Sequence, residues 1–388
     1  MTSSVDPAAG TAAGSTPGGA TPSRDRMLDG LRGAAAIAVV QYHFLLLSGL
    51  DAEPGAGLIG VLVFFVLSGY LITGILWRTD GRPPTAYRDF VARRVRRLAP
   101  ALLGLVLVSG VLVTVAGPGD ARAAVAGGLI VLAQLTGLWH VFGTFPVEPW
   151  LPAWSLTVEW VFYLLWPLAL AVMRRRGMST TSAMRMALAL AAVLYLASMP
   201  LSPKAFYYLP VGNLAVMLVG AALALAHARS PRRTGGRDAA IADLAFLAFV
   251  VAVLLPSTGA SGSWFYRVSY VPVAVGVALV LIDQRPGTRG LARRLLESSP
   301  MVEVGRSSYS LYLWHLPILW SAYWGLPGLS VAARVGLATV ALVPVVWLSF
   351  TLLEKPVLRP KPYAVRPGAD RGRVSPVPTP DPVGQRPL

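Results

Sequence analysis

Eleven apolar runs, each about long enough to cross a membrane, dominate this chain of 388 residues. A spanning helix needs about 20 mostly apolar residues, and a water-soluble protein of this length does not bury so many such runs. The composition agrees, since 55% of the residues are hydrophobic and 13% are charged, with a mean hydropathy of +0.59. The runs lie at about 30–50, 57–77, 98–116, 125–142, 153–173, 183–199, 209–227, 240–256, 268–283, 305–324 and 332–353. The sequence therefore predicts an all-α fold, a polytopic transmembrane helix bundle.

Arginine-rich segments between the runs predict the side of the membrane on which each loop lies. They follow the second, fifth, seventh and ninth runs, at 78–97, 174–176, 229–237 and 285–294. Loops rich in Lys and Arg remain in the cytoplasm. If all eleven runs crossed, the loop at 174–176 and the basic loops after it would lie outside the cell. Ten crossings plus one re-entrant or partial helix place every basic loop, and both termini, in the cytoplasm.

The run at 125–142 is the one that we predict not to cross. It contains Gly127, Gly128 and Gly137, and Gln134 and His140 interrupt its apolar residues. Irregular backbone at membrane depth is tolerated only where protein buries it or where it lines a water-filled cavity. We therefore expect this segment to be re-entrant or to lie in the outer half of the membrane, and we expect a cavity in the bundle.

The two ends of the chain differ in composition from the apolar part. Residues 1–25 are rich in Ala, Gly, Ser, Thr and Pro, and residues 358–388 are rich in Pro, Arg and Val. Such segments lack the large apolar side chains that a packed core needs, so we predict two disordered tails around one transmembrane domain at 26–357. The first apolar run is too long for a signal peptide, and we interpret it as a retained span of a multi-pass protein of the cell's inner (plasma) membrane.

Charge and cysteine content exclude several functions. The net charge of +16 arises from arginines in short loops, which indicates topology and attraction to anionic lipids rather than nucleic-acid binding. The chain has no cysteine, which excludes disulfides, thiolate metal sites and a cysteine acyl-enzyme. No spacing of His and carboxylate residues is typical of a metal site, so no metal is expected.

Asp29, Arg32 and His43 form a polar stripe in the first apolar run. Arg32 and His43 are eleven residues apart, which on a helix returns to within about 20° of the same face. The same spacing puts His43 about 16 Å beyond Arg32, near the middle of an apolar layer about 30 Å thick. Ionisable groups at that depth indicate a functional site.

Five motifs occur in an order that is as informative as their content. They are Asp-Gly-Leu-Arg-Gly at 29–33 leading to Tyr-His at 42–43, Phe-Phe-Val-Leu-Ser-Gly-Tyr-Leu-Ile at 64–72, Arg-Arg-Val-Arg-Arg-Leu-Ala-Pro at 93–100, Trp-Ser-Leu-Thr-Val-Glu at 154–159 with Phe-Tyr at 162–163, and Ser-Tyr-Ser-Leu-Tyr-Leu-Trp-His at 308–315 with Glu-Lys-Pro at 354–356. Together they resemble the membrane-bound acyltransferase-3 family, whose members O-acylate sugars and sugar-bearing molecules. The resemblance runs from about residue 26 to 356.

The resemblance implies that Arg32 and His43 are catalytic. The residues support this independently, because acyl transfer to a hydroxyl needs a base that accepts a proton near neutral pH, and histidine has an unperturbed pKa of about 6.5. The structural alternative is a histidine hydrogen-bonded between helices. Asp29 either pairs with Arg32 and sets its direction or caps the helix near its start.

Arg94 and Arg97 correspond to the family's Arg-x-x-Arg motif. They are three residues apart on one helix face, and the charge pattern puts them in the cytoplasm, where acyl-coenzyme A is found. Guanidinium groups bind phosphate oxygens in a bidentate way, so the pair is expected to bind this donor. The alternative is that these arginines serve only membrane topology, and we expect smaller roles for Arg93 and Arg96.

Four further residues are candidates for the site. Glu159 is the one carboxylate of its apolar run, so we expect it to be catalytic. Its expected partner is His43, Arg32 or the acceptor hydroxyl. The alternative is a purely structural ion pair. Trp154 and Tyr163 are candidates to stack on a sugar, but aromatic residues also gather at membrane interfaces for solvation alone. Trp154, Tyr163, Asp29 and His315 are the predicted substrate-binding set. The family pattern includes His315, and packing at a proline kink is its alternative explanation.

These predictions combine into an integral membrane O-acyltransferase. It would move an acyl group from acyl-coenzyme A, bound by Arg94 and Arg97, to a hydroxyl of a cell-surface glycan or an antibiotic sugar. His43 would act as general base, and Arg32 would stabilise the oxyanion or place the thioester. The rival hypothesis is a transporter or flippase of a lipid-linked or small sugar, because buried charged residues also build substrate pathways.

Overall fold

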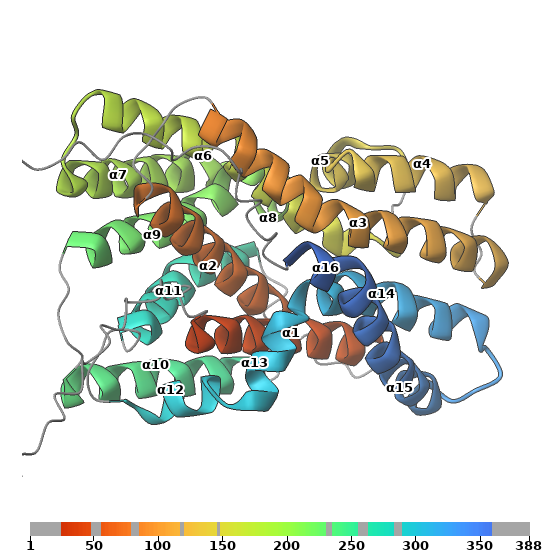
Figure 1. The fold of residues 1–388 in the computed structure, drawn as a ribbon. Helices are drawn as coiled ribbons and strands as arrows, with labels where there is room; N and C mark the ends of the chain where they lie inside the picture. The colour runs from red at the N-terminus through yellow and green to blue at the C-terminus, as the bar shows by residue number, and fades with distance from the viewer. Residues whose placement is uncertain are drawn as a thin grey trace, which may run out of the picture.

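The computed structural model describes residues 25–47, 56–78, 85–116, 120–145, 148–229, 235–254, 263–282 and 289–358. Every regular element in these ranges is helical (Figure 1), as the all-α prediction requires. Apart from Asp25 and Leu358, the two predicted tails lie outside the described residues.

Long helices form most of the molecule, and short ones connect them. The long helices are α1 (Arg26–Leu47), α2 (Ala56–Arg78), α3 (Thr85–Ala116), α6 (Trp154–Arg175), α7 (Thr180–Ser198), α9 (Pro210–Arg229), α10 (Gly236–Leu254), α11 (Ser263–Ile282), α14 (Ser308–Gly325) and α15 (Val331–Ser349). The short elements are α4 (Ala121–Leu132), α5 (Thr136–Phe142), η1 (Leu151–Ala153), α8 (Pro203–Tyr208), α12 (Leu291–Leu296), α13 (Ser299–Arg306), the π-helix η2 (Phe350–Glu354) and α16 (Lys355–Leu358).

Seven segments of the described residues are long and apolar enough to cross a membrane. They contain α1, α2, α3, α6, α7, α8 with α9, and α15 with its C-terminal extension. The predicted runs at 240–256, 268–283 and 305–324 correspond to α10, α11 and α14, which are helical but do not meet the same length and hydropathy standard. The chain is therefore a multi-pass membrane protein, and the number of ten crossings stays a prediction.

The segment at 125–142 is interrupted, as the sequence predicts. It forms the end of α4 and all of α5, with Gln134 between them in the left-handed region at a φ of 61°. At about 1.5 Å per residue, α4 is about 18 Å long and α5 about 10 Å, so neither crosses an apolar layer of about 30 Å. Helix α4 lies along α3 at the upper right of Figure 1. Its depth in the membrane is still a prediction.

Glycines bring the backbones of the central helices together. A Cβ at Gly69 of α2 would overlap the carbonyl oxygen of Met217 in α9, and one at Gly305 of α13 would overlap the carbonyl oxygen of Asp29 in α1. Close backbone approach is how helices associate in a membrane, where no hydrophobic force favours helix contact over lipid contact. Gly69 therefore serves the packing of α2 against α9.

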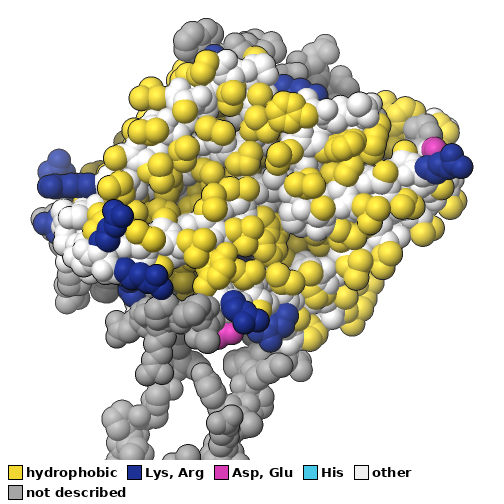
Figure 2. Space-filling view, turned by 90° about the horizontal axis from the view of Figure 1, so that it is seen from above, with side chains coloured by type: hydrophobic (Ala, Val, Ile, Leu, Met, Phe, Trp, Pro, Cys, Tyr) yellow, Lys and Arg dark blue, Asp and Glu magenta, His cyan; other side chains and the backbone are white. Residues whose placement is uncertain are grey.

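The outer surface carries large apolar side chains. Val111 and Val115 of α3 are 62% and 80% exposed, and Val340, Val343 and Trp347 of α15 are 71%, 69% and 63% exposed. Figure 2 shows a face that is mostly hydrophobic, with Lys and Arg toward its edges. Such a surface is stable against lipid and would aggregate in water.

Helix ends that the charge pattern assigns to the cytoplasm lie close together. The Arg26 guanidinium donates to the carbonyl of Glu297 at 2.8 Å, and Tyr309 Oη donates to the carbonyl of Leu98 at 3.0 Å. The Arg174 guanidinium donates to the carbonyl of Trp77. These contacts join three pairs of segments: the start of α1 with the end of α12, the basic part of α3 with the start of α14, and the end of α2 with the end of α6.

Candidate active site

A cavity of about 310 Å³ opens among α1, α2, α3, α6 and α14, beside the basic part of α3 and the N-terminal half of α6. Apolar side chains such as Leu28, Phe64 and Leu156 form part of its wall. Its polar lining consists of Asp25, Asp29, Arg32, Ser68, Arg94, Arg97, Ser155, Glu159, Tyr163, Ser308, Tyr309 and Tyr312. A cavity was predicted from the interrupted segment at 125–142, but this cavity is not lined by α4 or α5.

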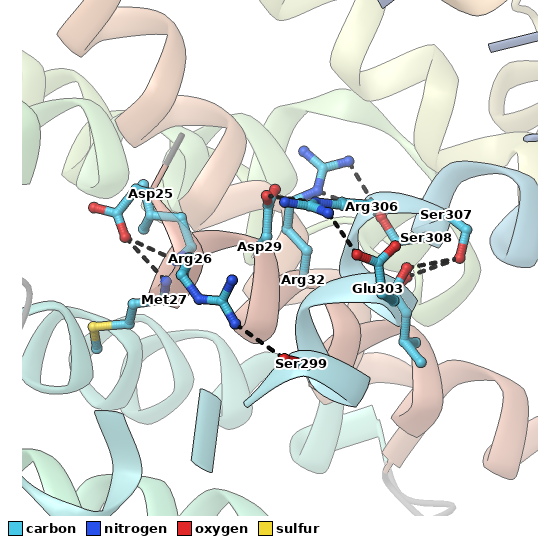
Figure 3. Close-up of polar contacts among 12 residues, drawn as sticks. Asp25, Arg26, Met27, Asp29, Arg32, Ser299, Glu303, Arg306, Ser307 and Ser308 are labelled. Atoms are coloured by element: carbon cyan, nitrogen blue, oxygen red, sulfur yellow. Dashed lines mark hydrogen bonds and ion pairs between the residues drawn. The ribbon is translucent and has the colours of Figure 1, made fainter. Parts of the chain in front are cut away.

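Arg32 extends from α1 toward the start of α14. Its Nε and Nη2 atoms each lie 3.4 Å from the hydroxyl of Ser308 (Figure 3). Its guanidinium lies 5.9 Å from the ring centre of Phe64. Both contacts are weak, since 3.4 Å is long for a hydrogen bond and Ser308 supplies a single neutral acceptor. The side chain is held in position while most of its donors remain available to a ligand.

Arg94 and Arg97 face the cavity, whereas Arg93 and Arg96 are exposed on the other side of α3. The Arg94 guanidinium lies 5.2 Å from the ring centre of Tyr163, in the range of a cation–π contact. The Nε of Arg97 is buried without a hydrogen-bond partner among the described residues. A buried N–H donor without an acceptor destabilises the folded protein, and a ligand that supplies an acceptor oxygen removes this cost.

Glu159 is held by two hydroxyl groups. Ser68 Oγ donates to its Oε1 at 3.1 Å, and Tyr163 Oη donates to its Oε2. These partners differ from His43 and Arg32, two of the three expected partners, and pairing with the acceptor hydroxyl stays a prediction. Tyr163 lies one helical turn beyond Glu159 on α6, and Ser68 comes from α2, so the carboxylate is fixed in the cavity wall by two helices.

Asp29 pairs with a residue that the sequence did not single out. Its Oδ2 lies 4.0 Å from the Nε of Arg306 on α13, and Figure 3 shows the two side chains facing each other. Helix capping is performed by Asp25, whose Oδ1 accepts from the backbone N–H groups of Met27 and Leu28. Asp29 thus joins α1 to α13 in addition to lining the cavity.

Three arginines of the cavity lining are available to bind a ligand. Each lining carboxylate accepts from or pairs with groups other than the cavity arginines, and no described carboxylate lies within ion-pair distance of Arg32, Arg94 or Arg97. Three guanidinium groups without ion pairs, in a partly enclosed space, favour a polyanionic ligand with oxygen acceptors.

His43 lies away from this cavity and contacts a second histidine. Its Nδ1 is 2.9 Å from the carbonyl oxygen of Val39 and 3.2 Å from Nε2 of His315. His43 is not among the residues that line the cavity. The ring of Tyr312, which does line it, is centred 5.7 Å from that of His315. The three arginines therefore line this cavity and His43 does not.

Trp154 and His315, two of the predicted substrate-binding residues, lie in the packed interior. Trp154 is 4% exposed, and its ring contacts those of Phe65 and Tyr207 at 6.0 and 4.8 Å between centres. His315 is fully buried. Neither lines the cavity, whereas Tyr163 and Asp29 do.

Hydroxyl groups are the part of the site that the sequence did not identify. Ser308 contacts Arg32, Ser68 contacts Glu159, and Tyr312 Oη lies 2.8 Å from Ser155 Oγ. The signal was present, since these residues belong to three of the five motifs. Serines and tyrosines in apolar helices are too common for spacing alone to distinguish them from packing residues.

Comparison with known proteins identifies the family. A family model described as an acyltransferase domain, acyltransferase 3, matches residues 25–354. The chain is 31% identical over 315 residues to a Bacillus subtilis protein named as a peptidoglycan O-acetyltransferase, YrhL, in a match that covers 75% of this chain and 48% of that protein. It is 27% identical over 312 residues to the O-acetyltransferase OatA of Staphylococcus aureus, covering 75% of this chain and 50% of that protein.

A third relative extends the match. The peptidoglycan O-acetyltransferase OatA of Listeria monocytogenes is 26% identical over 356 residues, which cover 85% of this chain and 55% of that protein. The chain spans about half the length of these curated relatives, and no solved structure matches it. Together with its membrane-length helices, the match over residues 25–354 shows that the chain belongs to the acyltransferase 3 family and is a multi-pass membrane protein.

Proposed function

We propose that this protein transfers an acyl group from acyl-coenzyme A to a hydroxyl of a cell-surface glycan. Peptidoglycan is the first acceptor to test, because two of the relatives are named as peptidoglycan O-acetyltransferases. An antibiotic sugar is the second acceptor to test. The acceptor would approach from the outer side, and the donor from the cytoplasm.

The observation that carries this proposal is the cavity with three guanidinium groups that form no ion pair. Coenzyme A is a polyanion whose phosphate oxygens match Arg94 and Arg97, on the cytoplasmic end of α3 in the predicted topology. The unpartnered Nε of Arg97 and the loosely held Arg32 supply donors that a phosphate or a carbonyl oxygen would satisfy.

In the proposed reaction, His43 removes the proton from the acceptor hydroxyl as its oxygen attacks the thioester carbonyl. The tetrahedral oxyanion collapses, the carbon–sulfur bond breaks, and the leaving thiolate takes the proton from the His43 imidazolium, which gives an ester, the free thiol of coenzyme A and a neutral histidine. Arg32 and His43 are about 16 Å apart along α1, so the flexible arm between the phosphates and the thioester has to cover this distance. Direct transfer needs no acyl-enzyme.

The test uses membranes that contain the protein, acetyl-coenzyme A labelled in the acetyl group, and muropeptides or glycosides as acceptors. Label should appear on the acceptor with the native chain and fall by about 100-fold or more with His43→Ala, as expected for loss of a general base. His140→Ala is the matched control, since His140 packs on Tyr208 away from the cavity, and it should keep native activity. Sugar movement across the membrane without acylation would instead support transport.

A further inference from the structure

A further inference concerns His43 and His315, the two histidines that contact each other between α1 and α14. It rests on the proposed role of His43 as general base. We propose that His315 is a positioning residue: it holds the His43 ring in the tautomer whose Nε2 carries the lone pair, and it stabilises the ring once that ring is protonated. His315 thereby differs from the substrate-binding role predicted from the sequence.

The first step of the argument concerns His43 itself. Its Nδ1 lies 2.9 Å from the carbonyl oxygen of Val39, one turn earlier on α1. A carbonyl oxygen only accepts, so Nδ1 must carry the proton. In a neutral imidazole the other nitrogen then holds the lone pair, and Nε2 is the atom able to remove a proton from a hydroxyl.

The second step applies the same reasoning to His315. Its Nδ1 lies 2.6 Å from the carbonyl oxygen of Tyr312 and must also donate. Its Nε2 is therefore an acceptor, and it lies 3.2 Å from Nδ1 of His43. The His43 N–H is shared between Val39 and His315, and every atom of the contact has a consistent role. A proton on Nε2 of His315 would set two N–H groups against each other.

The third step is the change during reaction. When Nε2 of His43 takes the acceptor's proton, the ring becomes an imidazolium and its Nδ1–H becomes a stronger donor. The lone pair of His315 then stabilises the positive charge more than it stabilised the neutral ring, which lowers the barrier. No carboxylate of the described residues forms an ion pair with either ring, so a neutral imidazole takes the orienting place that a carboxylate has in Ser-His-Asp triads.

His315 can hold the His43 ring because the part of α14 around His315 is itself fixed in place. The ring is fully buried, and Tyr312, one turn earlier, is anchored through its hydroxyl to the carbonyl of Pro152 at 2.7 Å. The carbonyl that orients His315 thus belongs to a residue that is itself held by η1. Both rings have little freedom, which is what a positioning contact requires.

The experiment compares His315→Leu and His315→Gln with the native chain in the acyl-transfer assay. Leucine removes the acceptor, so kcat should fall by about 100-fold, while KM for acetyl-coenzyme A changes by less than about twofold. Glutamine can present its side-chain oxygen to the His43 Nδ1–H, and it should restore kcat to within about tenfold of the native value. A role in packing alone predicts that glutamine is at least as harmful as leucine.

Two further measurements separate this inference from the proposed function. If His43→Ala abolishes transfer while His315→Leu keeps the native kcat, the positioning role is wrong and the base stands. If His43→Ala is active, the proposed function itself fails. Nitrogen-15 NMR of histidine-labelled native protein, with His43→Ala as the difference spectrum, should show the Nδ1–H tautomer for His43. An Nε2–H tautomer would overturn the inference even if the His315 variants do not fold.

Discussion

At the scale of single residues, helix periodicity distinguishes the roles of arginines that are close neighbours in the sequence. Four arginines stand at 93, 94, 96 and 97 in α3, and only Arg94 and Arg97 line the cavity. The pair three residues apart shares a face, while Arg93 and Arg96 point outward about 100° away. All four charges contribute to membrane topology, but only Arg94 and Arg97 are placed to bind a ligand in the cavity.

We predict that Arg97→Ala raises KM for acetyl-coenzyme A by about 10- to 100-fold, the loss expected for one charge-assisted hydrogen bond to phosphate. Arg96→Ala removes the same charge from the same turn and should change KM by less than about threefold. Arg97→Lys should be intermediate, because an ammonium keeps the charge without the planar fork. Initial rates at varied donor concentration measure this. Equal effects of Arg96→Ala and Arg97→Ala would mean that these arginines serve only topology.

At the scale of elements, glycines decide where helices cross, and the crossing of α2 with α9 sets the cavity wall. Gly69 is in backbone contact with Met217, and the preceding residue, Ser68, donates to Glu159. A shift of α2 away from α9 would move Ser68 relative to Glu159. Packing and site geometry are therefore linked through one Ser-Gly pair.

Gly69→Ala should destabilise the protein, because its new methyl group overlaps the backbone of α9 and the helices must separate. We expect a loss of about 1–3 kcal/mol, seen as a lower apparent Tm in detergent. Gly276→Ala in α11 is the matched control, since a Cβ there meets no atom within 4 Å, and it should be neutral or slightly stabilising. Similar Tm values for the two variants would contradict the close α2–α9 contact.

At the scale of the whole molecule, contacts between helix ends and the charge pattern divide the bundle into two sides. The contacts of Arg26, Arg174 and Tyr309 join these basic segments in pairs. The predicted topology puts the joined segments, with Arg94 and Arg97 of the cavity lining, in the cytoplasm.

The absence of cysteine makes this topology testable with single substitutions. Arg176→Cys and Gly328→Cys both fall at exposed positions, between α6 and α7 and between α14 and α15. With ten crossings, a membrane-impermeant maleimide added to intact cells should label Gly328→Cys, and it should label Arg176→Cys only after the membrane is opened. Labelling of both from outside would require an even number of crossings between residues 176 and 328, where the predicted topology has an odd number.

The sequence by itself determined the class of fold, the family and most of the charged site residues. Long apolar runs have no stable alternative to helices in lipid, and the interruption at Gln134 was visible as polar and glycine residues in one run. Arg32, Arg94, Arg97 and Glu159 could be found because charges in apolar surroundings are costly and stand out from their neighbours.

Only the tertiary structure decided which of these residues meet. Glu159 is bound by Ser68 and Tyr163 rather than by His43, and His43 contacts His315, 272 residues away in the chain. Helical spacing fixes the face of one helix on which a residue lies, but the partner helix and its register depend on backbone contacts such as those of Gly69 and Gly305. Those contacts depend on the shapes of two surfaces at once, which a single apolar pattern does not encode.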